Sequence, residues 1–188
     1  LARNRQTFGD RVGLREKDLG VWQEISWSQY YEHVKQFCLG AVSLGLKKGD
    51  KLAILGDNCR EWLYADLGAQ AAGAVPVGVY ATNPPQQVEY VLRHSDSVLV
   101  VVKDQEQADK VLEVMGALPL LKKIIVIDMK GLRHYDDPHI ISFDQVEALG
   151  RKKAEENPQF FESLISEIRA DDVALMVYTS GTTGPPKG

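Results

Sequence analysis

The last eleven residues of the chain carry the residue types and the spacing most able to do chemistry. They read YTSGTTGPPKG over residues 178–188 and directly follow an apolar run. Glycines let a backbone turn through positive φ and bring its N–H groups close to a ligand. Hydroxyl and ammonium donors are supplied by Thr179, Ser180, Thr182, Thr183 and Lys187. Such a segment is typical of a cradle for a polyphosphate.

The Walker A loop, G-x-x-x-x-G-K-[ST], is a phosphate cradle that also follows a strand, but the segment does not fit it. Counted from Gly181, the second glycine would stand where the chain has Pro186, and Lys187 is followed by Gly188 rather than by Ser or Thr. Two prolines before the lysine also prevent the loop from running straight into a helix. A flexible linker of similar composition would not need the fixed order that ends in Pro-Lys-Gly. The segment therefore indicates a phosphate loop of another kind.

The eleven residues closely resemble the signature loop of the AMP-forming acyl-CoA synthetases, the superfamily that also holds firefly luciferase and the adenylation domains of peptide synthetases. The match runs through the whole segment, with Pro185 at a position that varies in the family. Further segments resemble the long-chain fatty-acid branch, particularly its bacterial and bubblegum-type members; they are residues 56–58, 61–62, 73–80, 83–84, 88–95 and 135–138.

The resemblance implies a two-step reaction in a larger parent enzyme, a long-chain fatty-acid–CoA ligase. A fatty carboxylate attacks the α-phosphate of Mg-ATP to give acyl-AMP and pyrophosphate, and the thiol of coenzyme A then displaces AMP to give the thioester. ATP, Mg²⁺ and coenzyme A are the cofactors and co-substrates that this implies. By the same resemblance Lys187 stabilises the charge of the departing pyrophosphate, and Thr179 approaches the magnesium ion. The β- and γ-phosphates are expected on Ser180, Gly181, Thr182, Thr183 and Gly184.

Short apolar runs alternate with amphipathic segments along the chain, which favours buried parallel strands separated by helices. Strands are predicted at residues 51–55, 75–79, 98–102, 124–127 and 174–178. Helices are predicted from a cap at Ser28 to Gly45, and at residues 61–73, 84–94, 105–118, 143–156 and 160–168. A hairpin is predicted around residues 17–20 and a loop at residues 129–141.

The predicted fold is therefore α/β, with a largely parallel sheet and helices on both faces. The resemblance makes it the first subdomain of the large N-terminal domain of an adenylate-forming enzyme. We expect residues 1–188 to form a single subdomain. Its parts are a hairpin region at 1–27, an alternating helix and strand body at 28–173, and a strand plus phosphate loop at 174–188.

The chain is expected to be a piece of a longer protein, because family members are several hundred residues long. It has 188 residues, begins at Leu1 without an initiator Met, and stops one residue after Lys187. The family's adenine, ribose, acyl and mobile-lysine motifs have no counterpart in it. Three functions stay open: part of a long-chain enzyme that is inactive alone, part of a ligase for an aryl, short-chain or amino acid, or an inert or phosphate-binding subdomain.

Composition agrees with a fold that buries a core. Hydrophobic residues make up 44% and charged residues 26%, and the formal net charge is −4, which gives no general attraction to nucleic acid or to an anionic membrane. The most apolar window, residues 63–80, contains Asp66, Gln70, Gly73 and Pro76 and predicts a helix and a strand rather than a membrane span. The parent is expected in the cytoplasm, with peripheral membrane association and the oligomeric state left open.

The cysteines, the histidines of residues 134–139, the basic run and the tryptophans are better explained by structural roles than by functional sites. Cys38 and Cys59 are too few and too far apart for a disulfide framework or a structural zinc site. Residues 134–139, with two histidines and two aspartates, are better explained by a turn-rich loop before Pro138 than by a metal site. The basic run at 151–153 beside two glutamates is typical of a solvated helix face, and the tryptophans are expected in core or interface positions.

Overall fold

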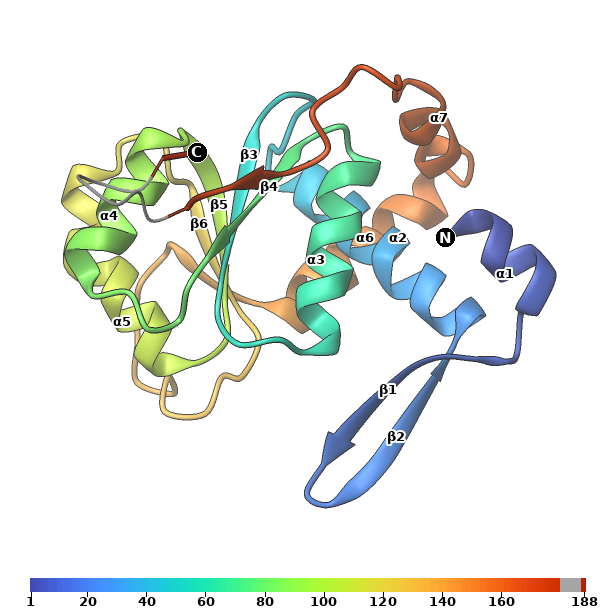
Figure 1. The fold of residues 1–188 in the computed structure, drawn as a ribbon, viewed down its shortest axis with the longest axis horizontal. Helices are drawn as coiled ribbons and strands as arrows, with labels where there is room; N and C mark the ends of the chain where they lie inside the picture. The colour runs from blue at the N-terminus through green and yellow to red at the C-terminus, as the bar shows by residue number, and fades with distance from the viewer. Residues whose placement is uncertain (180–186) are drawn as a thin grey trace.

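The computed structural model describes residues 1–179 and 187–188, in which helices pack on both sides of a central sheet (Figure 1). The strands are β1 (Val12–Asp18), β2 (Val21–Ser26), β3 (Lys51–Leu55), β4 (Val75–Val79), β5 (Ser97–Val102), β6 (Lys123–Val126), β7 (Ile140–Ser142) and β8 (Met176–Val177). The helices are α1 (Ala2–Phe8), α2 (Trp27–Ser43), α3 (Arg60–Ala71), α4 (Pro85–His94), α5 (Gln105–Val114), α6 (Phe143–Glu156) and α7 (Phe160–Ser166), with a 3-10 turn at Met115–Ala117.

Strands β3 to β8 form one parallel sheet in the order β7-β6-β5-β3-β4-β8. Successive residues of β3 point to opposite faces. Leu52 and Ile54 join a core with α2, α3 and α6, whereas Ala53 and Leu55 join a core with α4 and α5. The two helical layers lie on either side of the sheet in Figure 1. The predicted α/β class, with a parallel sheet covered on both faces, is confirmed.

The strand order creates a crevice at the carboxyl end of the sheet. The chain leaves β3 for α3 on one face and leaves β4 for α4 on the opposite face. Neighbouring strands whose connections diverge in this way leave a gap in which ligands of α/β proteins commonly bind. Strand β8 pairs with the other edge of β4, with Val77 opposite Met176 and Gly78 opposite Val177. The sheet therefore delivers the residues after β8 to the rim of this crevice.

The start of α2 corrects one prediction. Its N-cap is Ser26, not Ser28: the Ser26 hydroxyl accepts from the Gln29 amide at 3.2 Å, and the Gln29 side chain accepts from the Ser26 amide at 2.8 Å. Ser26 is followed three residues later by a glutamine and can form this reciprocal capping box, whereas Ser28 is followed by Tyr31. The predicted end is confirmed, because Gly45 takes a φ of 91° just after the helix.

Three short elements differ from the sequence prediction. Strand β7 lies at the end of the predicted 129–141 loop and pairs with β6, but three residues are too few to show a period of two. The last strand was expected at residues 174–178 and covers only Met176–Val177. Helix α1 was not expected; none of its residues is buried, so it carries no apolar stripe. Within residues 1–179 no helix is long and apolar enough to cross a membrane.

Candidate functional site

The predicted phosphate loop begins at the carboxyl end of β8. Thr179 and Lys187 form an antiparallel bridge: the Thr179 amide donates to the Lys187 carbonyl at 2.9 Å, and the Lys187 amide donates back at 3.1 Å. Both residues are exposed. The bridge occupies backbone groups only, so it fixes the two residues to each other without engaging the ammonium of Lys187. The other predicted phosphate ligands, Ser180, Gly181, Thr182, Thr183 and Gly184, lie outside the described residues.

Tyr178 anchors the start of the loop to α4. Its side chain is 5% exposed, and its hydroxyl lies 2.7 Å from Nδ1 of His94. The His94 ring stacks on Tyr90 at 5.4 Å and meets the Tyr178 ring edge-on. Burial raises the pKa of the Tyr178 phenol, with smaller contributions from Tyr90 and Asp96, so the group stays neutral at physiological pH. Gly188 lies against the same ring, where a β-carbon would come within 2.7 Å of Tyr178 Cζ.

Removal of the Tyr178 hydroxyl is expected to weaken the fold slightly. Tyr178→Phe keeps the buried ring but leaves Nδ1 of His94 without its partner, so the free energy of unfolding should fall by about 1 kcal/mol. Urea unfolding monitored by circular dichroism measures it. Tyr80→Phe is the matched control, because Tyr80 is 68% exposed and its loss of a hydroxyl should change little. Equal stability of both variants would show that the Tyr178–His94 contact does not anchor the loop.

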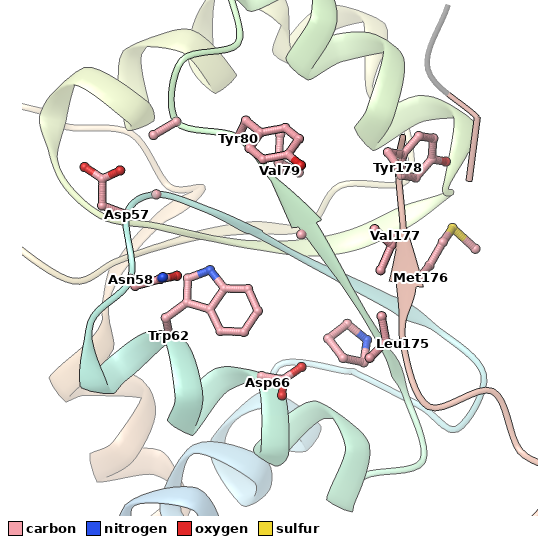
Figure 2. A pocket seen from close by; sticks show the side chains of 14 residues that line it. Asp57, Asn58, Trp62, Asp66, Val79, Tyr80, Leu175, Met176, Val177 and Tyr178 are labelled. Atoms are coloured by element: carbon pink, nitrogen blue, oxygen red, sulfur yellow. The ribbon is translucent and has the colours of Figure 1, made fainter. Parts of the chain in front are cut away.

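A cavity of about 550 Å³ opens beside Tyr178, between α3 and strands β4 and β8 (Figure 2). Its rim comes from the carboxyl ends of three strands: Asp57 and Asn58 follow β3, Tyr80 follows β4, and Tyr178 follows β8. The wall is completed by Trp62, Asp66, Pro76, Gly78, Val79, Ala81, Leu175, Met176 and Val177, with Gly56 at the rim. The cavity thus runs along α3, β4 and β8 and opens at the carboxyl end of the sheet, where the strand order creates the crevice.

The chemistry of this cavity differs from that of the loop. Trp62, Leu175 and Val177 give it an apolar wall, and its formal charges are the carboxyl groups of Asp57 and Asp66. Burial raises the pKa of Asp66, while a hydrogen bond from the Gln70 amide at 3.2 Å opposes the rise. Carboxylates repel phosphate groups. The cavity therefore suits an uncharged, partly apolar group better than a phosphate.

The structure shows the local surroundings of the 134–139 loop and of the two cysteines, whereas Trp22, expected in a core or interface position, is 61% exposed. In the 134–139 loop Asp137 accepts from both the amide and the ring of His139, each at 2.8 Å. The pKa of Asp137 is lowered chiefly by the backbone bond from His139. Among residues 1–179 and 187–188 no group of three His, Cys, Asp or Glu side chains is placed to hold a metal ion. Cys38 and Cys59 are buried free thiols, as predicted.

Two parts of the site were not predicted from the sequence. The pairing of Tyr178 with His94 joins residues that are 84 positions apart, so no local pattern in the sequence indicates it. The cavity-lining residues Asp57, Asn58 and Trp62 lie in segments that the sequence marks only by their resemblance to the long-chain branch. The sequence does carry one signal for the cavity. Polar residues follow the predicted strands at residues 51–55 and 75–79, and the carboxyl ends of parallel strands meet at the same edge of a sheet.

Comparison with known proteins places this geometry in context. The family described as AMP-binding enzyme matches residues 1–188. The long-chain-fatty-acid–CoA ligase ACSBG2 of Xenopus laevis is 35% identical over 183 residues, which cover 96% of this chain and 24% of that protein. The human long-chain-fatty-acid–CoA ligase ACSBG1 is 31% identical over 187 residues, with 96% and 24% covered. The chain thus spans about a quarter of the length of these relatives.

Solved structures show the same fold. The anthranilate CoA ligase AuaEII, crystallised in complex with anthranoyl-AMP, superposes with a TM-score of 0.80 at 24% sequence identity, covering 98% of this chain and 32% of that chain. At this identity the likeness concerns the fold alone. The arrangement of the sheet and its flanking helices is therefore that of the N-terminal part of an adenylate-forming ligase.

Proposed function

Because the chain belongs to the AMP-binding enzyme family, we propose that it is part of a long-chain fatty-acid–CoA ligase that works through an acyl-adenylate. The observation that carries the proposal is the position of the Thr179–Lys187 bridge at the carboxyl end of β8, beside the crevice of the sheet. The similarity to long-chain-fatty-acid–CoA ligases supports the choice of acid.

The proposed chemistry is displacement at phosphorus followed by thioester formation. A carboxylate oxygen bonds to the α-phosphorus of ATP while the bond to the β-phosphate oxygen breaks, which gives acyl-AMP and pyrophosphate. The sulfur of coenzyme A then bonds to the acyl carbon, its thiol proton is lost, and AMP leaves. The reacting groups are all anionic in the first step, so the protein must neutralise charge and align the displacement.

This chain is proposed to handle the leaving group. Backbone amides at Gly181 and Gly184, with the hydroxyls of Ser180, Thr182 and Thr183, would hold the β- and γ-phosphates, and Lys187 would add positive charge. The described geometry supports the last of these roles, because Lys187 is an exposed residue whose backbone is tied to Thr179. The Tyr178–His94 pair positions the loop and does not touch the phosphates in this scheme.

The resemblance also implies a magnesium ion. Mg²⁺ prefers several oxygen ligands in octahedral geometry, and of the described residues only the Thr179 hydroxyl was proposed to contribute one. The described residues therefore do not by themselves form a magnesium site. Thr179 stays a proposed ligand of the ion.

Acid-dependent exchange of labelled pyrophosphate into ATP tests the function. The intact protein is expected to support exchange with palmitate, and at a rate well above that with benzoate or acetate. Faster exchange with benzoate or acetate would reassign the acid but keep the reaction, and no exchange with any acid would refute the ligase. The 188-residue chain alone is expected to show no exchange, because a loop with few phosphate contacts has to offset about 1–2 kcal/mol of backbone entropy for each residue it orders.

A further inference from the structure

A second cavity, of about 270 Å³, lies where strand β2 meets the first two turns of α2, α3 and α6. Its wall comes from residues 23–25 of β2 and from side chains of the three helices, among them His33, Arg60, Tyr64 and Glu147. It is here called the three-helix cavity. None of its residues lines the crevice beside β8 or belongs to the phosphate loop, so the proposed reaction gives it no role.

Carboxylates outnumber guanidinium groups around the three-helix cavity. Four carboxylates belong to its wall, those of Glu24, Glu61, Asp144 and Glu147. Three of them have ion-pair partners, at 2.8, 2.8 and 4.0 Å, which are Arg15, Arg60 and Arg151. Glu16 adds a fifth carboxylate, 3.5 Å from the Arg60 guanidinium. With His33 counted as neutral these groups leave a formal charge of −2, which attracts a cation and repels an anion.

The hydroxyl of Tyr64 is a buried polar group without a partner. Tyr64 is 2% exposed, and within residues 1–179 and 187–188 nothing forms a hydrogen bond with its hydroxyl. Its ring is held by stacking on His33, with ring centres 4.6 Å apart. Burial raises the pKa of the phenol; Arg60 opposes the rise, and Glu61 and Glu147 add to it. These three charged residues line the cavity, which places the hydroxyl at its wall. Buried hydroxyls nearly always have a partner, so this one indicates a bound group.

Two carboxylates of the cavity also keep the capacity to accept hydrogen bonds. The side chain of Glu147 is 8% exposed, and its Oε1 lies 2.7 Å from Nδ1 of His33. Its Oε2 is 4.0 Å from the Arg151 guanidinium, which is too far for a hydrogen bond. Asp144 is exposed and has neither an ion pair nor a side-chain hydrogen bond with any residue that the structure describes. A bound group that donates several hydrogen bonds would therefore find acceptors here.

We propose that the three-helix cavity binds the guanidinium group of a small molecule or of an arginine side chain. A guanidinium carries five N–H donors and a permanent positive charge, and it can serve the Tyr64 hydroxyl and the carboxylates of Glu147 and Asp144 together. A metal ion fits less well, because the described residues place no group of three His, Cys, Asp or Glu side chains to hold one. Buried Ile25 and Phe143 in the wall suit a short alkyl chain. The proposal does not depend on the reaction proposed above.

Calorimetric titration of the intact protein with n-butylguanidinium tests the proposal, with n-butylurea as the uncharged ligand of the same shape. Wild type is expected to bind the cation at least about tenfold more tightly. Tyr64→Phe should lower the affinity about threefold to tenfold, because it removes one acceptor. It should also keep or raise the melting temperature, since the hydroxyl has no partner in the fold. Asp144→Asn changes an exposed residue and should lower the affinity about threefold without loss of stability.

Tyr80→Phe is the matched control, because Tyr80 is 68% exposed outside this cavity and its loss of a hydroxyl should leave binding unchanged. Three outcomes would overturn the proposal: no saturable binding of n-butylguanidinium, equal binding of n-butylurea, or undiminished binding by both Tyr64→Phe and Asp144→Asn. Acetylarginine methylamide presents the same group on a peptide backbone and distinguishes the two sources. Tighter binding than n-butylguanidinium would assign the site to an arginine side chain, and weaker binding to a free small molecule.

Discussion

Replacing Lys187 with Ala in the intact protein is expected to slow acyl-adenylate formation about 30- to 1,000-fold. Loss of one preorganised donor to a developing negative charge typically costs about 2–4 kcal/mol in the transition state. The effect should be largely catalytic, because the two hydrogen bonds between Lys187 and Thr179 use backbone atoms that alanine retains. Pyrophosphate exchange with a saturating fatty acid measures the rate, and urea unfolding measures the stability.

Lys152→Ala is the control for the loss of a surface charge, since Lys152 is an exposed lysine on α6. It should change neither the exchange rate nor the stability beyond a few tenths of a kcal/mol. A Lys187→Ala protein with a normal exchange rate would remove the lysine from the mechanism. A slower rate accompanied by an equal loss of unfolding free energy would give Lys187 a structural role instead.

The core of the fold was predictable because burial leaves a strong mark on the sequence. Runs such as Leu52–Leu55 and Leu99–Val102 are apolar on both faces of the sheet, and a strand that is covered on both sides shows no alternation. Shorter elements leave weaker marks. Strand β7 has three residues, and α1 buries none, so neither could be recognised from periodicity.

The candidate site also has a part that the sequence predicts and a part that it does not. The phosphate loop was recognisable because its glycines, hydroxyls and lysine are contiguous in the sequence and can be recognised together as one motif. The Tyr178–His94 contact and the cavity beside Trp62 depend on β8 entering the sheet next to β4, although almost one hundred residues separate the two strands in the chain. No local pattern specifies that pairing, so these features required the structure.

Close approach of α2 and α6 is another feature that only the structure shows, and it predicts a large loss of stability for Gly150→Ala. Helix α6 lies across α2 at two glycines. A β-carbon on Gly150 would overlap the carbonyl oxygen of Gln36, and one on Gly40 would overlap that of Val146. Both obstacles are helix backbone, which cannot turn aside as a flexible side chain can. The helices would have to separate, and we expect the free energy of unfolding to fall by about 2–4 kcal/mol.

Gly116→Ala is the matched control, because Gly116 lies in the 3-10 turn after α5 and a β-carbon there meets nothing within 4 Å. Both variants remove the same backbone freedom from the unfolded chain, which favours alanine by about 0.4–1 kcal/mol. The difference between them therefore isolates the steric cost at the helix contact. Urea unfolding of both variants measures it, and a Gly150→Ala protein as stable as Gly116→Ala would mean that α2 and α6 do not touch backbone to backbone.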